Sequence, residues 1–212
     1  SSASSYVYNR HISSKVLSRL NVGVFHVASI HPIHSFANPE NSIANLKKVP
    51  FAIEGDAEAI NLLNHLCIAI GGQPFAINSA SKSLYHAATV MACNNLVSLL
   101  EISKGMLVQA GVDVKHSGNP LDLLIQQTVT NYLSSGAQKA LTGPIARGDV
   151  DTVASHLLAL QSTPDGWQDA YRGLGKMAVN ISAKQGQASP EQLQDILQLL
   201  NIDPNNQTVD IT

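Results

Sequence analysis

Three short clusters of polar residues and glycine stand between apolar segments of this chain, and they hold the side chains best suited to chemistry. They are HPIHSF at 31–36, KSLYHA at 82–87 and ALTGPIARGD at 140–149. Imidazole, ammonium and guanidinium groups can move protons or hold anions, and a packed domain seldom needs them in otherwise apolar stretches. The three clusters therefore predict one site that is assembled from separated pieces of chain.

The first cluster follows an apolar run at 22–30 that we predict to be a strand. Ligands of open α/β sheets bind beyond the carboxyl ends of strands, and Pro32 holds His31 in an extended conformation. We therefore predict that His31 acts in catalysis, that His34 contacts substrate and that Pro32 contacts a cofactor. Two alternatives are a structural role for His31 and a metal site, for which Glu40 is a poor third ligand.

The second cluster opens a predicted helix and places Lys82 and His86 one turn apart on one face. A lysine at a helix start opposes the helix dipole, which argues against a purely structural choice. We predict that Lys82 donates a proton, that His86 orients the substrate and that Asn94 hydrogen-bonds it from a neighbouring stripe. The alternative is a solvated Lys82 beside a packed His86.

The third cluster joins two predicted helices. Arg147 can hold a carboxylate through two hydrogen bonds, and the hydroxyl of Thr142 can contribute another. Asp149 stands where it can cap the next helix. The alternative is a tight helix connection with an Arg–Asp pair at its surface.

A glycine-rich phosphate loop would be the usual companion of such residues. The only match to its spacing, GLGKMA at 173–178, lies inside a segment that is helical throughout. Because the fingerprint requires a preceding strand and a following helix, we interpret these glycines as helix-packing residues.

The predicted elements divide the chain into an α/β part and an all-α part. Strands are predicted at 22–30, 49–55 and 73–79, with a helix at 11–20 and another that runs from Asp56 to the Gly71–Gly72 pair. This order indicates a parallel sheet. The segment 83–110 is predicted to be a helix that is apolar nearly all round, and further helices are predicted at 121–133, 149–160, 165–183 and 190–200.

The predicted fold class is therefore a partial parallel α/β sheet followed by an all-α part. We place the boundary between the two near 79–81. Three strands are too few for a parallel sheet that is covered on both faces. The missing strands are expected from other chain or from a second copy.

The composition argues against a nucleic-acid-binding protein and against a membrane-spanning protein. The net charge is −2, and only 13% of residues are charged, about half of the usual ~25%. The basic residues are scattered, which excludes nucleic acid as a partner, and no apolar run reaches the ~18 residues of a membrane span. Cys67 and Cys93 are predicted to be reduced and buried, which favours the cytoplasm. The chain starts without Met or a signal peptide, as a processed or incomplete chain would.

The three clusters carry a resemblance to a known family over about residues 11–200. The chain resembles bacterial Rossmann-like reductases with a helical second domain of unassigned function, which are relatives of pyrroline-5-carboxylate reductase, prephenate dehydrogenase and the 3-hydroxyacid dehydrogenases. HPIHSF, VPFAIEGD, KSLYHAATVMACN and ALTGPIARGDVDTVASHL carry it, the last most specifically. The KxxxN pattern of the hydroxyacid dehydrogenases has a counterpart here with His86 in the place of Asn.

The resemblance implies a partial Rossmann-like parallel sheet followed by a helical dimerisation domain. Residues 1–80 would be the C-terminal part of a Rossmann-like nucleotide-binding domain, and residues 81–212 a helical substrate and dimerisation domain. It also implies an NAD(P)-dependent oxidoreductase that uses NADP or NAD. It implies a small substrate with a C=O or C=N bond, and homodimers that form through the helical domain. The family's GxGxxG half would lie before Ser1, so we expect cofactor binding by this chain to be weak or absent. Two alternatives stay open: a non-catalytic helical dimerisation or scaffold module, and a histidine-based metal hydrolase.

Overall fold

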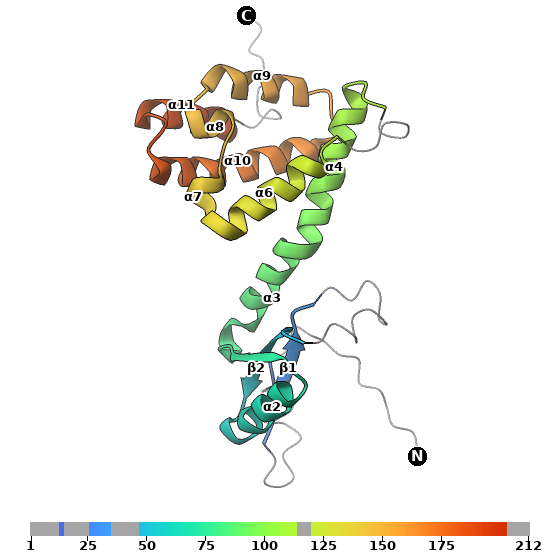
Figure 1. Ribbon diagram of the computed structural model, residues 1–212. Helices are drawn as coiled ribbons and strands as arrows, with labels where there is room; N and C mark the ends of the chain where they lie inside the picture. Colours follow the sequence, from blue (N-terminus) through green and yellow to red (C-terminus); the bar gives the residue numbers. More distant parts are fainter. Residues whose placement is uncertain (1–12, 15–25, 35–46, 114–119, 203–212) are drawn as a thin grey trace, which may run out of the picture. The chain divides into compact units, whose positions relative to one another are not determined.

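The computed structural model describes residues 13–14, 26–34, 47–113 and 120–202. The chain divides into two compact units, residues 1–98 and 99–212. Each unit is described by itself below, and Figure 1 shows the elements of both. This division falls later in the chain than the functional boundary near residue 80, which stays a prediction.

The sheet of the first unit has three strands in the order β1–β2–β3. They are β1 (Ala28–Pro32), β2 (Pro50–Gly55) and β3 (Gln73–Ala76), and helix α2 (Ala57–Ala69) joins the last two. The predicted strand, helix, strand unit is confirmed, because β2 and β3 are parallel. The last of the three strands ends at Ala76, three residues before its predicted end.

The prediction of an all-parallel sheet is wrong for β1, which runs antiparallel to β2. A parallel neighbour needs a crossover that returns the chain to the opposite end of the sheet, whereas an antiparallel neighbour starts where the first strand stops. Here the amide of Ile33, just past β1, donates to the carbonyl of Pro50 at the start of β2 (2.8 Å). The side-chain pattern of an apolar strand is the same whether it pairs in parallel or antiparallel. The sequence therefore could not predict the direction of β1 relative to β2.

The two faces of this sheet differ in chemistry. Ile30, Phe51 and Ile53 pack with Cys67 of α2 in an apolar cluster. Because side chains alternate along a strand, the residues between them point to the other face. That second face carries Ser29 and His31 from β1, and Ala52 and Glu54 from β2.

Helix α2 starts and ends near its predicted limits. Asp56 occupies the position before the helix but makes no capping bond there. Its carboxylate instead accepts a hydrogen bond from the amide of Val27 (2.7 Å), which fastens the turn to the start of β1. After the helix, Gly71 takes φ +81°, a left-handed conformation that suits glycine and ends the helix.

The predicted helix at 83–110 is confirmed and contains a π-helical segment. A short 3₁₀ turn, η2 (Ser79–Ser81), precedes α3 (Lys82–Val90), which continues through the π-helix η3 (Met91–Asn95) into α4 (Leu96–Gln109). Gly111, at φ +88°, follows the end of α4 as predicted. Although this helix is apolar nearly all round, no residue of α4 is buried in the described part of the chain.

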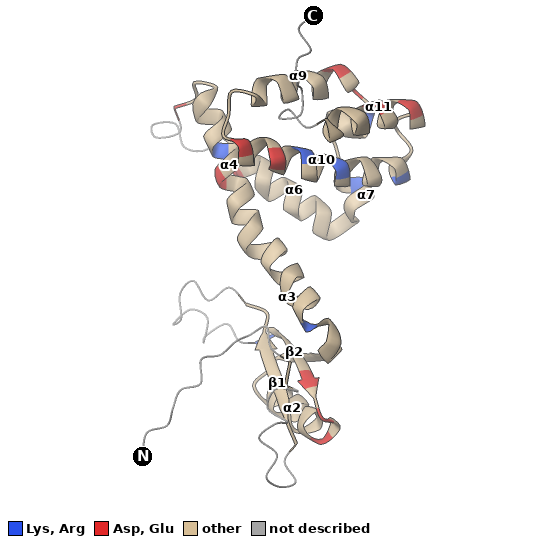
Figure 2. Cartoon of the chain, turned by 180° about the vertical axis from the view of Figure 1, so that it is seen from behind, with Lys and Arg blue, Asp and Glu red and all other residues tan. Residues whose placement is uncertain are grey.

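The described part of the second unit is helical, as predicted. Beyond α4 its helices are α6 (Asp122–Ser135), α7 (Ala137–Ala140), α8 (Pro144–Arg147), α9 (Val150–Leu160), α10 (Asp165–Gln185) and α11 (Pro190–Asn201). Their apolar core draws on α8 to α11 and includes Ile145, Val153, Ile196 and Leu200. Helix α6 contributes no buried residue. In Figure 2 it is almost free of charged residues, as is α9, whereas α10 carries several.

The glycines at 173–178 lie inside α10, as predicted. A Cβ on Gly175 would come within 3.0 Å of Leu200, so this glycine permits close contact between α10 and α11. Gly173 has open space around it and has no such role. At the start of α11, Ser189 and Gln192 form a capping box, and Pro190 occupies the first turn as predicted.

Some predictions fall outside the described residues: the helix at 11–20 except for Ser13 and Ser14, the start of the strand at 22–30, and Glu40. Cys67 is buried and Cys93 is exposed, so the burial predicted for the second thiol is wrong, and both are free. Among the described helices, none has both the length and the apolar character needed to cross a lipid bilayer.

Candidate functional site

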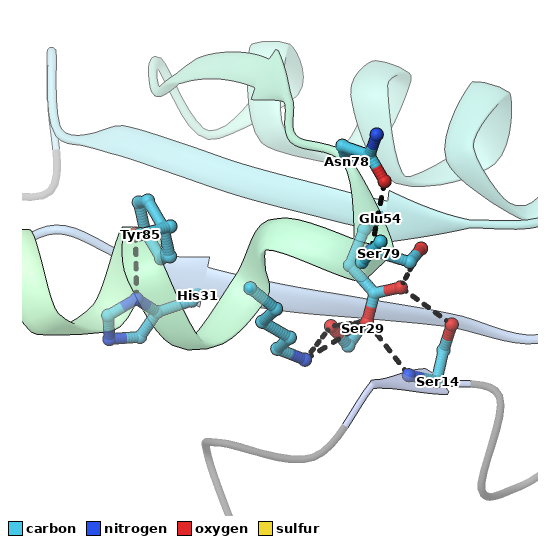
Figure 3. Close-up of polar contacts among 9 residues, drawn as sticks. Ser14, Ser29, His31, Glu54, Asn78, Ser79 and Tyr85 are labelled. Carbon is cyan, nitrogen blue, oxygen red and sulfur yellow. Dashed lines mark hydrogen bonds and ion pairs between the residues drawn. The ribbon is translucent and has the colours of Figure 1, made fainter.

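A buried carboxylate, Glu54, is the centre of the polar face of the sheet. Glu54 lies on the central strand β2, and its residue is only 1% exposed. Its oxygens accept hydrogen bonds from the amide and hydroxyl of Ser14 (both 2.8 Å), from the hydroxyl of Ser29 (2.8 Å) and from the hydroxyl of Ser79 (2.5 Å). Figure 3 shows these three serines converging on the carboxylate from different segments. A buried carboxylate needs such donors because desolvation is costly.

Lys82 completes this cluster as an ion-pair partner. Its Nζ lies 3.0 Å from a carboxylate oxygen of Glu54 and donates to the hydroxyl oxygen of Ser29 at 2.6 Å. The two charged side chains are 8% and 1% exposed. The alternative of a solvated Lys82 is therefore wrong. Ser29 accepts from the ammonium and donates to the carboxylate, so one hydroxyl bridges the two charges.

The hydrogen bonds keep Glu54 ionised. Burial alone would raise the pKa of this carboxyl group, but the hydrogen bonds from Ser79, Ser14 and Lys82 outweigh it and lower the pKa to about 2. A carboxylate with this pKa remains negative at any physiological pH. It therefore holds the neighbouring ammonium as a permanent counter-ion.

A second polar group occupies the same face of the sheet farther along β1. Nδ1 of His31 lies 2.8 Å from the hydroxyl oxygen of Tyr85 on α3, and the two rings meet edge to face, with centroids 5.7 Å apart. Figure 3 shows this pair beside the Glu54 cluster. The ring of His86 lies 6.1 Å from that of His31, and Phe75 of β3 contacts Tyr85. Burial raises the pKa of Tyr85, so its hydroxyl stays protonated.

The structure thus brings together three residues predicted from the first two clusters. Lys82, His31 and His86 all belong to the first unit, on or beside one face of its sheet. His34 and Pro32 are half-buried close by in sequence. Asn94 lies in the π-helical segment and is exposed. Its role stays a prediction.

The third cluster belongs to the second unit and has a structural explanation. Gly143 (φ +91°) and Gly148 (φ +72°) flank the short helix α8, and Asp149 caps α9 by accepting from the amide of Thr152 (3.1 Å), as predicted. A Cβ on Gly148 would lie 2.5 Å from the side-chain oxygen of Gln192, the residue that completes the capping box of α11. These contacts make the cluster a tight helix connection, as in its alternative interpretation, but the Arg–Asp pair of that alternative is not among the ion pairs of the described residues.

Arg147 and Thr142 both have exposed side chains in this connection. Among the described residues, the side chain of Arg147 forms no hydrogen bond or ion pair, although its charge helps to lower the pKa of Asp149 after the bonds from Thr152. Binding of a substrate carboxylate by Arg147 stays a prediction, as does its convergence with the histidines.

Sequence analysis missed Glu54, Ser29 and Tyr85. Glu54 could have been predicted from the sequence. A carboxylate in an apolar run such as PFAIEG must either end the strand or pair with a buried cation. The next lysine or arginine after Glu54 in the sequence is Lys82, at the start of the helix after the next strand. The pairing of Ser29 with Glu54 required the register of β1, which the sequence did not provide.

The described residues do not fit the pyrophosphate of a dinucleotide. Such a group binds to amides of a glycine-rich turn at a helix start. The described turn between β2 and α2 instead carries the carboxylates of Asp56 and Glu58 in that position, and the described turn between β3 and α3 contains no glycine. Likewise, no group of three metal-ligating side chains occurs among the described residues.

An apolar groove of about 250 Å³ lies within the second unit, between α4 and α10. Leu99, Ile102 and Met106 line one side, and Trp167 and Leu174 line the other. Its polar members, Ser103 and Tyr171, are already hydrogen-bonded, to a backbone carbonyl and to His156. It offers a ligand only apolar contact.

Two solved structures share the fold. A crystal structure of a protein from Thermotoga maritima matches with a TM-score of 0.67 and 26% identity, covering 82% of this chain and 67% of that one. A second, from Bacteroides fragilis and named a "putative NADP oxidoreductase", matches with a TM-score of 0.58 and 19% identity, covering 82% of this chain and 61% of that one. At that identity the likeness concerns the fold alone.

None of the curated proteins matches this chain. A family model does match it, over residues 49–178, a span that contains Glu54, Lys82, Tyr85 and the whole third cluster. Because that span is more than half of the 212 residues, the chain belongs to the family defined by the domain of unknown function DUF2520.

Proposed function

We propose that this chain belongs to an NAD(P)-dependent oxidoreductase. The reaction is hydride transfer to or from the C=O or C=N bond of a small, carboxylate-bearing substrate, with NADP as the expected cofactor. One observation carries the proposal: a buried ion pair and a histidine–tyrosine pair lie on one face of a small sheet. The fold likeness to a Bacteroides protein named for NADP chemistry supports it.

Each polar group has a task in this proposal. Lys82, held by Glu54, provides a fixed positive charge and remains the predicted proton donor. His31 and His86 orient the substrate. Asn94, His34, Thr142 and Arg147 are the proposed substrate contacts, Arg147 through the carboxylate.

No described residue is assigned to the phosphates of the cofactor, because the β2–α2 turn carries carboxylates where a pyrophosphate would need amides. When bound, a nicotinamide dinucleotide supplies or accepts the hydride. This chain supplies charge, hydrogen bonds and proton transfer around the substrate.

The test uses the full product of the gene that encodes these residues. NADP and NAD binding is measured by calorimetry, and turnover is measured with a panel of small 2-oxo and imino acids. We expect NADP to bind, and Lys82→Ala to lower kcat by about 100-fold, as loss of a general acid does. The control is Lys139→Ala, which removes an ammonium group from the second unit. Absence of both binding and turnover would reject the oxidoreductase.

Homodimer formation through the helical domain is the second part of the proposal. Residues 83–100 contain no Asp, Glu, Lys or Arg. Large apolar side chains are exposed on two helices: Val97 (59%) and Val108 on α4, and Leu124, Tyr132 and Leu133 (77%) on α6. Exposed apolar side chains in such numbers mark interaction surfaces, and a second copy would cover them. This observation also favours the alternative of a non-catalytic dimerisation module.

Light scattering after size-exclusion chromatography tests the dimer. We expect a dimer for the unmodified protein and a monomer for Leu133→Glu, because a buried unpaired carboxylate is costly. The matched control is Leu158→Glu, which changes a leucine of similar exposure (68%) on α9. A monomeric unmodified protein would refute this part.

A further inference from the structure

Helix α6 has little to pack against in the described part of the second unit. It has 14 residues, none of them is buried, and no side chain caps its start. Of the described elements, only α7, which follows it in the sequence, makes an extensive contact with it. A helix of this length is marginally stable by itself in water, and helices in proteins are stabilised mostly by packing of an apolar side. The fold therefore needs a further surface that covers α6.

One side of α6 is an apolar stripe. Large side chains at helical spacing form it: Ile125, Val129, Tyr132 and Leu133. The first is half-buried and the other three are exposed. Residues 123–138 contain no Asp, Glu, Lys or Arg. Apolar side chains at positions i, i+4 and i+7 are the anchors with which a helix docks into an apolar groove, so the α6 stripe has the pattern of a docking surface.

The second unit also contains a groove of matching chemistry. The groove between α4 and α10 has a volume of about 250 Å³, and its lining includes no Asp, Glu, Lys or Arg. Leu174 lines it and is still 44% exposed. No residue of the α6 stripe lines this groove in its own chain. An exposed apolar stripe and an open apolar groove therefore occur in the same unit, and each lacks what the other would supply.

We propose that two copies of this chain exchange these surfaces, so that the α6 stripe of each copy docks in the α4–α10 groove of the other. This inference rests on the dimer part of the proposed function and names the contact that forms the dimer. Reciprocal docking repeats one contact about a two-fold axis, as closed dimers do. A second copy fits both surfaces at once, because it brings a stripe to the groove and a groove to the stripe.

The area of this contact is close to that of a stable dimer. Each copy contributes the α6 stripe and the large side chains of the groove: Leu99, Ile102, Met106, Trp167 and Leu174. If each of these side chains loses on the order of 80 Å² of apolar surface, one copy buries roughly 700 Å². A stable interface takes ~800 Å² from each partner. Because α6 is covered only in the pair, we expect an obligate dimer whose dissociation also unfolds α6.

The first test removes an anchor of the stripe from the full product of the gene. Tyr132→Ala should raise the dissociation constant of the dimer, measured by sedimentation equilibrium, by about 30-fold or more, as loss of a central interface side chain does. The matched control is Leu123→Ala. Leu123 is 65% exposed, against 57% for Tyr132, but lies on the other side of α6. It should change the dissociation constant by no more than about threefold, since exposed substitutions outside an interface have small effects.

The second test fills the groove. Ala170 lines the α4–α10 groove, so Ala170→Trp would occupy the space that the partner's stripe needs. We expect it to raise the dissociation constant as much as Tyr132→Ala does. The second unit offers a control groove of the same volume, about 250 Å³, where α10 meets α11. Ala183→Trp in that groove should leave the dissociation constant unchanged.

The third test asks whether the exchange is reciprocal. A mixed pair of one Tyr132→Ala chain and one Ala170→Trp chain has one intact contact between stripe and groove, whereas each variant alone has none. Native mass spectrometry of the mixture should therefore show more mixed dimers than random pairing gives. If stripe packed against stripe, the mixture would show no such excess, and the inference would be overturned.

The outcomes separate this inference from the proposed function. A dimer that neither Tyr132→Ala nor Ala170→Trp weakens would keep the dimer and overturn the exchange. A monomeric protein would overturn both, and slow hydrogen exchange of α6 in that monomer would show that the same chain covers it. Circular dichroism should show loss of helix on dissociation, and unchanged helix content would contradict the inference. If Ala170→Trp fails to fold, Ser103→Phe fills the same groove from α4.

Discussion

The two units bury different kinds of residue. The interior of the first unit includes an ion pair, Lys82 and Glu54, with Ser14 beside it. The interior of the second is mostly aliphatic, and its buried hydroxyl, Ser182, donates to backbone carbonyls of α8. A buried ion pair gives little net stability compared with an apolar pair of the same volume. The difference indicates that the first unit keeps charged groups in place for a task other than stability.

The two units also differ in the surroundings of a histidine–tyrosine pair, which is His31–Tyr85 in the first unit and His156–Tyr171 in the second. Both have the same hydrogen-bond length and ring geometry. The first lies beside a buried ion pair and a second histidine, whereas the second stands at the surface between α9 and α10. Local geometry is therefore the same in both units, and only the surroundings distinguish a candidate site from a surface contact.

The largest expected effect comes from breaking the ion pair. Lys82→Met leaves Glu54 buried and unpaired, so the first unit should lose about 3–5 kcal/mol of stability. Hydrogen exchange should rise in the peptides of β2 while α11 is unchanged. The double variant Lys82→Met with Glu54→Gln should recover most of the loss, and a double variant as unstable as the single one would contradict the assignment.

Low pH should destabilise the first unit more than the second, by less than the Lys82→Met substitution does. The pKa of Glu54 is lowered from 4.5 to about 2, so its contribution is complete above about pH 4.5 and is lost as the pH falls toward 2. The loss should reach about 3 kcal/mol at the acid end. Amide NMR signals of Ile53 should disappear at a higher pH than those of Ile196. The Asp149 and Glu191 carboxyls, whose pKa values are also lowered, are on the surface of the second unit and contribute less.

The smallest effect concerns the third cluster. Gly148→Ala places a methyl group against Gln192 and requires a left-handed conformation, and it should cost about 2 kcal/mol. Fluorescence of Trp167, the single tryptophan, reports unfolding of the second unit in urea. Gly143 also has a positive φ, but an added Cβ there would meet open space. Gly143→Ala should therefore cost only the strain of a left-handed backbone, about 1 kcal/mol. Equal costs would show that contact with Gln192 is unimportant.

Helices were the most predictable part of the fold, because their caps and periods are local. Asp149 before α9 and Pro190 in α11 marked real helix starts. The direction of β1 was not predictable, because strand pairing depends on residues far apart in sequence. The site was found in part: Lys82, His31 and His86 were singled out by residue type, while Glu54 and Tyr85 were not.

The sequence alone determined the α/β start, the helical remainder and the polar residues that interrupt them, since these follow from side-chain period and from residues that start and end helices. Tertiary structure decided what those residues do. Only the register of β1 against β2 sets Ser29 beside Glu54, and only the approach of α3 brings Lys82 and Tyr85 to the same face. The physical reason is that a buried charged group is stable only beside its ion-pair and hydrogen-bond partners. Those partners are far apart in the sequence and come together only when the chain folds.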